Sequence, residues 1–285
     1  MTGATLAYEV VDVFAGRAFA GNPLAVVLDG DDLTTEQMQA IAGEFNLSET
    51  TFPLAAPEGA TYGLRIFTPT TELPFAGHPS VGSAWVLHRL GRIDAGDNVQ
   101  ACGAGLLPVH VGPDEVMLTG GTPEVTDALD AGSFLEALGL VPDDLVGPPP
   151  RLAGVGIPWG FLLVRPEALA DAAPDVRRLT ALGGTGVSLL AWDGSVARCR
   201  VFAGGAGVPE DPATGSAALA LGVYLHAAGL LADGEHSYVV EQGYEMGRPS
   251  TLLCTVTITD GAVTRTTVAG SVIPIARGEI TVPPA

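Results

Sequence analysis

The chain has 285 residues, 47% of them apolar, and a formal net charge of −19. This charge repels nucleic-acid phosphates and anionic lipids, and the basic residues form no run, so we expect neither nucleic acid nor membrane as a partner. All thirteen basic residues are arginine. The absence of lysine excludes a pyridoxal phosphate enzyme, which needs a lysine amine, and a phosphate-binding P-loop.

No apolar run reaches the roughly 20 residues that a membrane-spanning helix needs. The N-terminal residues lack the cationic and apolar regions of an export signal, so we expect a cytoplasmic protein. Cys102, Cys199 and Cys254 are scattered without a C-x-x-C pair, which argues against a disulfide framework and against a structural zinc site.

The first half of the chain predicts strands and one amphipathic helix. Short apolar runs indicate strands at residues 8–14, 24–28, 64–67 and 115–119. Residues 35–45 place apolar side chains on one helical face, and Thr34 with Gln37 forms a capping-box pattern at the start.

The second half predicts a similar mixture. Strands are expected at residues 161–164, 188–192, 198–202 and 252–258. A short helix is expected to start at Ser133, with Glu136 three positions later. Residues 217–230 are apolar on all sides, which is typical of an enclosed helix. Residues 263–282 read as closing strands that could return to either half.

One heptapeptide pattern occurs twice: HPSVGSA starts at His78, and DPATGSA starts at Asp211. Arg65-Ile66-Phe67 precedes the first copy, and Arg200-Val201-Phe202 precedes the second. These matches at nearly constant spacing suggest an internal duplication. We therefore predict two similar domains, at residues 1–122 and 123–285, whose last strands could return to the first domain.

Each heptapeptide predicts a helix start. Proline is favoured in the first turn, and Asp211 is expected to be the N-cap before Pro212. Helix N-termini bind anions such as carboxylates, and Gly77 and Gly215 would let a ligand approach the backbone. If the domains are related by a two-fold axis, both helix starts can face one cleft. Either start alone is usually only a cap, but different residues in the two copies favour chemistry.

Glu49 is the candidate general base. It follows Asn46-Leu47-Ser48 and precedes an apolar run, and the matching stretch of the second half has no acid. A glutamate entering an apolar segment becomes partly desolvated, which raises its pKa toward the range useful for proton transfer. An ordinary surface glutamate is the alternative.

Several motifs in order resemble those of the PhzF phenazine-biosynthesis family, from about residue 8 to residue 281. They are Gly21-Asn22-Pro23-Leu24-Ala25-Val26-Val27, Asn46-Leu47-Ser48-Glu49-Thr50, Arg65-Ile66-Phe67-Thr68-Pro69, Glu72-Leu73-Pro74-Phe75-Ala76-Gly77-His78-Pro79, Asp211-Pro212-Ala213-Thr214-Gly215-Ser216-Ala217, and Gln242-Gly243-Tyr244-Glu245-Met246-Gly247-Arg248-Pro249-Ser250.

The resemblance implies an α/β (α+β) protein with the diaminopimelate-epimerase-like fold. In this fold two pseudo-symmetric domains each wrap a curved, mostly antiparallel sheet round a central helix, with the active site between them. The resemblance also implies a homodimer, with residues 243–250 shaping either the cleft or the dimer contact, and a role in secondary metabolism.

The implied activity is that of a metal- and cofactor-independent isomerase that moves a proton between carbons of a small carboxylic acid, similar to trans-2,3-dihydro-3-hydroxyanthranilate isomerase. The implied site residues fall into two groups. The catalytic residues are Glu49, His78 and Asp211, and the substrate-binding residues are Ser48, Gly77, Gly215 and Ser216.

Other functions stay open at this point. Related epimerases use two opposed cysteines, but the three cysteines here lie outside the matched motifs, so two-thiol racemisation is disfavoured. Serine hydrolysis is disfavoured because no G-x-S-x-G elbow is present, and no H-E-x-x-H metal motif occurs. An epimerase or racemase of an amino or hydroxy acid, or a non-catalytic small-molecule-binding protein of the same fold, remains an alternative.

Overall fold

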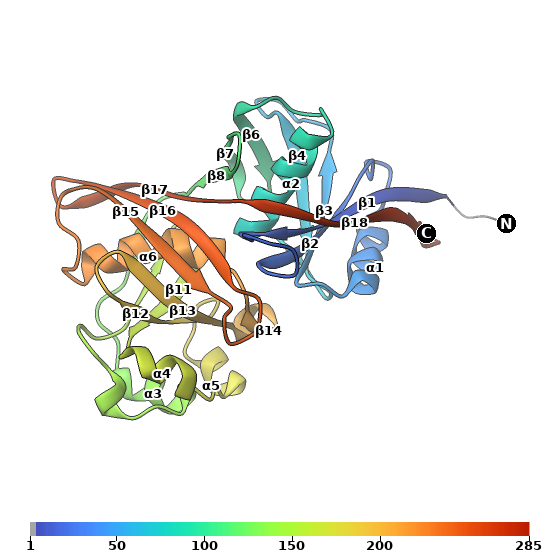
Figure 1. Ribbon diagram of the computed structural model, residues 1–285. Coiled ribbons are helices and arrows are strands. Elements are labelled where there is room, and N and C mark those ends of the chain that lie inside the picture. Colours follow the sequence, from blue (N-terminus) through green and yellow to red (C-terminus); the bar gives the residue numbers. More distant parts are fainter. Residues whose placement is uncertain (1–3, 285) are drawn as a thin grey trace. The chain divides into compact units, whose positions relative to one another are not determined.

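The computed structural model describes residues 4–284 and divides the chain into two compact units (Figure 1). Unit 1 contains the chain up to Leu118 together with the segment from Ala269 onward, and unit 2 contains Thr119–Val268. Both units are mixtures of strands and helices. Each has its own set of paired strands and its own hydrophobic core, so each is described separately.

Unit 1 is built on one sheet with the neighbour order β18-β1-β2-β3-β4-β6-β7-β8. The pairings β2–β3 and β4–β6 are parallel and the others are antiparallel, and the short β5 pairs with β4. The strands are β1 (Thr5–Val13), β2 (Asn22–Val27), β3 (Glu49–Leu54), β4 (Tyr62–Phe67), β5 (Glu72–Leu73), β6 (Gly96–Cys102), β7 (Gly105–Val111), β8 (Val116–Thr119) and β18 (Val272–Thr281).

Unit 2 repeats this plan with the order β9-β10-β11-β12-β13-β15-β16, in which β11–β12 and β13–β15 are parallel and β14 pairs with β13. A hydrogen bond between the hydroxyls of Thr255 and Thr267 links β16 to β17. The strands are β9 (Glu124–Val125), β10 (Arg151–Gly154), β11 (Pro158–Leu163), β12 (Val187–Trp192), β13 (Val196–Ala203), β14 (Val208–Asp211), β15 (Gly234–Gln242), β16 (Ser250–Thr259) and β17 (Ala262–Gly270).

Both units show the same order of parallel and antiparallel strand pairings, as expected for an internal duplication. Strand β1 corresponds to β10, β2 to β11, β3 to β12 and β4 to β13, and one 13-residue helix follows in each unit: α2 (Gly77–Arg89) and α6 (Gly215–Ala227). The chain therefore has two pseudo-symmetric halves with mixed, mostly antiparallel sheets.

The two long helices are enclosed by their sheets because nearly every side chain on them is apolar or small. Helix α2 packs on β1, β2, β3 and β7, and α6 packs on β10, β11 and β16. A Cβ added at Gly82 would lie 2.6 Å from Leu24 Cδ2 and 2.7 Å from Val13 Cγ2. This close approach fixes the depth at which α2 sits on the strands.

Shorter helices cover the other faces of the sheets. Helix α1 (Thr35–Phe45) packs Met38 and Ile41 against Val27, whereas Leu24, three residues earlier on β2, faces α2. Side chains alternate between the two faces of a strand, so α1 and α2 lie on opposite faces. Helices α3 (Ala131–Leu138), α4 (Pro166–Asp171) and α5 (Val176–Ala181) form the corresponding layer of unit 2.

Several expectations about helix ends are confirmed and others are corrected. The helix at 35–45 has the expected bounds, and both hydrogen bonds of the Thr34–Gln37 capping box form. Helix α3 starts two residues earlier than expected, because the carboxylate of Asp130 accepts from the backbone N–H groups of Gly132 and Ser133.

The predicted equivalence of the two heptapeptides as helix starts is wrong. Helix α2 begins at Gly77, so His78 lies inside its first turn. Asp211 is not an N-cap: it ends β14, and α6 begins four residues later at Gly215, after Thr214. The two patterns therefore occupy different structural positions, and the position that matches His78 in α6 is that of Ser216.

Candidate functional site

Glu49 and His78 come together within unit 1. Glu49 is the first residue of β3, and its register partner in the parallel pair is Leu24 of β2. His78 is the second residue of α2, which packs on β2 and β3. The Nε2 atom of His78 lies 3.3 Å from Oε2 of Glu49, and the two side chains are 5% and 12% exposed. The structure thus joins a predicted base to a predicted supporting residue.

The corresponding position in unit 2 carries no acid. There β11 pairs in parallel with β12, and the first residue of β12 is Val187. Among the described residues, this position therefore carries an acid in unit 1 but not in unit 2, as expected from the sequence.

His78 is held in its neutral form. Burial lowers the pKa of His78 to about 3, because an imidazolium ion would be cut off from water. At neutral pH the ring therefore carries one N–H. Its Nε2 is buried and meets no geometrically aligned hydrogen-bond partner among residues 4–284, although it faces Glu49. Leaving a buried polar atom without a hydrogen bond costs about 1–3 kcal/mol.

A chain of polar contacts continues from His78 through two residues. The Nδ2 atom of Asn22 lies 3.1 Å from Nδ1 of His78, and the hydroxyl of Ser48 donates to Oδ1 of Asn22 at 3.0 Å. Ser48 was predicted to bind substrate, and the structure shows it in contact with Asn22. Asn22 was not singled out from the sequence, because an asparagine before a proline and an apolar strand reads as an ordinary strand start.

Asp211 belongs to a second polar cluster, which lies within unit 2. Its carboxylate accepts from the hydroxyl of Thr214 at 2.5 Å. The side chain of Gln242 donates to the backbone oxygen of Asp211 and to the hydroxyl of Thr214, and accepts from the backbone N–H of Thr214. These bonds hold the turn between β14 and α6, which explains why Asp211 does not cap the helix. All three side chains are buried.

Ser216 lies in the first turn of α6, next to Gly215. Its hydroxyl oxygen accepts from the indole N–H of Trp159 at 3.2 Å. Trp159 is the second residue of β11 and is buried. The indole thereby uses one acceptor position of the hydroxyl, so the Ser216 O–H is left to donate elsewhere. Gln242 was not predicted as a site residue, because a single hydrogen-bonding side chain gives no sequence signal for this role.

Two of the three cysteines do not provide an alternative base. All three are free, and Cys199 and Cys254 are buried. Burial raises the pKa of the Cys199 thiol to about 12, and it raises the pKa of Cys254 above its usual range. Both thiols are therefore protonated at neutral pH. Among residues 4–284, no group of three or more His, Cys, Asp or Glu side chains is arranged to hold a metal ion, and no helix is long and apolar enough to cross a membrane.

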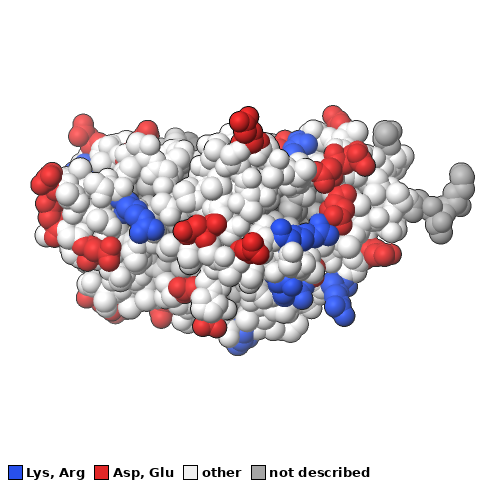
Figure 2. Space-filling model, turned by 90° about the horizontal axis from the view of Figure 1, so that it is seen from above, with Lys and Arg blue, Asp and Glu red and all other residues white. Residues whose placement is uncertain are grey.

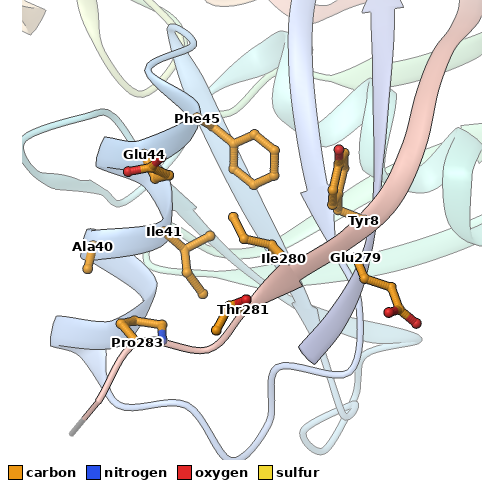
Figure 3. A pocket seen from close by; sticks show the side chains of 9 residues that line it. All are labelled: Tyr8, Ala40, Ile41, Glu44, Phe45, Glu279, Ile280, Thr281 and Pro283. Atoms are coloured by element: carbon orange, nitrogen blue, oxygen red, sulfur yellow. The ribbon is translucent and has the colours of Figure 1, made fainter. Parts of the chain in front are cut away.

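A hollow of about 530 Å³ lies elsewhere on unit 1, between α1 and the end of β18 (Figure 3). It is lined by Tyr8, Ala40, Ile41, Glu44, Phe45, Glu279, Ile280, Thr281 and Pro283. It contains none of the predicted site residues, and it lies on the α1 side of the sheet, whereas His78 belongs to α2 on the other side. The hydrogen-bonded clusters are better candidates for chemistry than this open depression.

Comparison with known proteins now identifies the family. The family model described as phenazine biosynthesis-like protein, PhzC-PhzF, matches residues 11–278. The chain belongs to this family. A trans-2,3-dihydro-3-hydroxyanthranilate isomerase from Pseudomonas fluorescens is 35% identical, and the match covers 96% of this chain and 98% of that relative. The PhzF chain is thus an enzyme of an isomerase family.

Solved structures agree on the fold. A PhzF-family phenazine biosynthesis protein from Bacillus anthracis superposes with a TM-score of 0.88 at 26% identity, covering 97% of this chain and 99% of that one. A hydroxyproline epimerase from Agrobacterium vitis superposes with a TM-score of 0.65 at 14% identity, covering 97% and 92%. The PhzF chain therefore has the diaminopimelate-epimerase-like fold expected from the sequence.

Proposed function

We propose that this PhzF-family member catalyses a cofactor-free shift of a proton between two carbons of a small cyclic or amino-bearing carboxylic acid, with Glu49 as the acid and base. The observation that carries the proposal is the buried contact between Glu49 and a neutral His78. The similarity to the Pseudomonas fluorescens isomerase supports the same reaction class.

The proposed reaction needs no external electron donor or acceptor. The Glu49 carboxylate takes a proton from a carbon conjugated with the substrate carboxylate, and the electron pair of the broken C–H bond spreads toward the carboxylate oxygens. Glu49 then returns the proton to another carbon, and the double bond moves. Glu49 ends as it began, so the cycle closes without a second base.

Other residues serve charge and orientation. The developing negative charge is stabilised by N–H donors, and the first backbone N–H groups of α2, at Gly77 and His78, have no partner inside the helix. We propose that Asp211, Gly215 and Ser216 hold amino, hydroxyl or carboxylate groups of a substrate. A homodimer and a cytoplasmic location also stay predictions.

Solvent deuterium exchange tests the role of Glu49. The protein is incubated in D₂O with a panel of cyclic and amino-bearing acids, including trans-2,3-dihydro-3-hydroxyanthranilate, and the products are analysed by mass spectrometry and NMR. The native protein is expected to incorporate deuterium, and Glu49→Gln to lose a factor of about 10²–10⁴ in rate, the usual contribution of general acid–base catalysis.

Glu44→Gln provides the matched control, because Glu44 is an exposed glutamate at the end of α1 in the same unit. It is expected to exchange at the native rate. Equal exchange by native protein and Glu49→Gln would overturn the assignment of the base. Exchange with inversion of a stereocentre and no moved double bond would instead show an epimerase, and binding of an acid without any exchange would show a non-catalytic protein.

A further inference from the structure

We propose that Asn22 is a positioning residue: its side-chain amide donates to Nδ1 of His78 and thereby fixes the imidazole tautomer with the N–H at Nε2, facing Glu49. This inference rests on the proposed role of Glu49 as a base, which must begin the reaction as a carboxylate. It adds a residue that was not expected from the sequence to take part.

The backbone places Asn22 with little freedom. Asn22 is fully buried at the start of β2, where it is the register partner of Val13 on β1. The preceding Gly21 has a φ of +65°, and a Cβ there would lie 2.3 Å from the carbonyl oxygen of Val13. Residue 21 must therefore be glycine, and this tight turn delivers the Asn22 side chain to the first turn of α2.

The hydrogen-bond chain has two possible directions, and only one suits an ionised Glu49. In the first, Ser48 donates to Oδ1 of Asn22, the amide NH₂ donates to Nδ1 of His78, and the single imidazole proton resides on Nε2. In the second, the amide is reversed and His78 donates from Nδ1. Nε2 would then present a lone pair to a carboxylate oxygen 3.3 Å away, which is repulsive.

Burial makes the choice of tautomer consequential. Since burial keeps His78 neutral, the ring carries a single N–H at neutral pH. Only one of its two nitrogens can therefore donate a hydrogen bond, and the other must accept. The hydrogen bond at one ring nitrogen therefore decides what the other nitrogen offers. Asn22, by donating at Nδ1, makes Nε2 a donor toward the base and the substrate.

Unit 2 contains the same arrangement with other residues, which supports a positioning role. Trp159, near the start of β11, donates its indole N–H to Ser216, the second residue of α6. In unit 1, Asn22 at the start of β2 contacts His78, the second residue of α2. In both halves, a side chain from the equivalent strand contacts the same position of the central helix, and in unit 2 that side chain donates an N–H.

Imidazole ¹⁵N NMR tests the inference directly, without any substrate. The protein has five histidines, and the His78 signals are identified as those missing from the spectrum of His78→Gln. In the native protein at pH 7, Nε2 of His78 is expected to carry the proton and Nδ1 to be bare. The opposite tautomer in the native protein would overturn the proposal, whatever the variants do.

Asn22→Asp supplies the second arm, because a carboxylate accepts where the amide donates. In this variant Nδ1 of His78 is expected to become protonated, and deuterium exchange is expected to fall at least tenfold while KM changes less than kcat. Asn46→Asp is the matched control: Asn46 is exposed, and aspartate tolerates its left-handed conformation. It should leave the His78 tautomer and the exchange rate unchanged.

The two proposals fail separately. A bare Nδ1 in Asn22→Asp would overturn the role of Asn22 even if exchange depends on Glu49. Conversely, the expected tautomers together with undiminished exchange in Glu49→Gln would overturn the base assignment and leave the positioning of His78 by Asn22 in place.

Discussion

At the residue scale, the sequence pointed to Glu49 and His78 but not to their supports. Glu49 was recognisable because a strand start in one half carries an acid and the matching start in the other half does not. Asn22 and Gln242 were not recognisable, because each acts through a hydrogen bond that forms only after distant strands and helices pack. A single sequence shows which residues can donate, but it does not show what they will face.

The buried His78 predicts a specific dependence of stability on pH. Its pKa is about 3 in the folded protein and about 6.5 when unfolded. The unfolded chain therefore binds more protons between these values, and stability falls as pH falls from about 6.5 toward 3. At pH 5 this group alone should lower the free energy of unfolding by about 2 kcal/mol relative to pH 7.

Urea unfolding of native protein and His78→Gln at pH 7 and pH 5 measures this effect. The many acidic side chains titrate in both proteins, so the difference between their pH dependences isolates the contribution of His78. The native protein should lose about 2 kcal/mol more than the variant. Identical losses would show that His78 can be protonated without penalty in the folded state.

At the scale of elements, the sequence predicted α1 to the residue because its capping box and apolar face are local signals. The start of α6 was misplaced because Asp211-Pro212 is a strong local cap pattern, and the distant Gln242 instead holds Thr214 and Asp211 in a turn. Strands β6, β7 and β15 were missed because their apolar runs are interrupted: Asn98 and Gln100 are buried polar residues of β6, Pro108 lies within β7, and β15 begins with Gly234-Glu235-His236-Ser237.

Local packing predicts opposite effects of a glycine-to-alanine substitution at Gly82 in α2 and at Gly43 in α1. In isolation, alanine is favoured over glycine in a helix by about 1 kcal/mol. At Gly82 a Cβ would meet Leu24 and Val13 at 2.6–2.7 Å, so Gly82→Ala should destabilise the protein by about 1–3 kcal/mol. At Gly43 in α1 the nearest atom is 3.6 Å away, so Gly43→Ala should stabilise it by up to about 1 kcal/mol.

Chemical unfolding of both alanine variants checks this pair, with circular dichroism to confirm that each is folded. A stabilising effect at Gly82 would mean that α2 can move away from β1 and β2 at little cost. In that case the approach of α2 to the strands would not fix the position of His78.

At the scale of the whole molecule, the duplication was predictable and its details were not. Matching motifs at nearly constant spacing indicated two similar halves, and the structure repeats the pairing order of their strands. The heptapeptide that first suggested the duplication turns out to occupy different structural positions in the two halves. Short motifs can match because their composition is similar. The order of strand pairings, in contrast, shows which elements of the two halves are equivalent.

The formal charge of −19 predicts a salt-dependent stability. Acidic side chains are spread over the face shown in Figure 2, with fewer basic ones between them. Their mutual repulsion opposes the folded state, and salt screens it. Raising NaCl from about 20 to 200 mM at pH 7 should raise Tm by about 2–4 °C, equivalent to roughly 1 kcal/mol.

Thermal scans at pH 7 and pH 5 test this explanation, since pH 5 lies nearer the sequence pI of 4.4. The increase in Tm should shrink at pH 5, where fewer carboxylates are ionised. A constant increase at both pH values would point to a specific chloride or sodium site in place of general screening.

The pairings of β9 and β18 have a consequence for the origin of such a chain. β9, which follows the first series of strands, pairs with β10 of the second series, and β18, which follows the second, pairs with β1 of the first. Each copy thus donates its final strand to the other, as in a strand-swapped dimer joined into a single polypeptide. A gene cut between the copies would leave β1 with an unprotected edge, so the isolated first piece should aggregate unless β18 is supplied in trans.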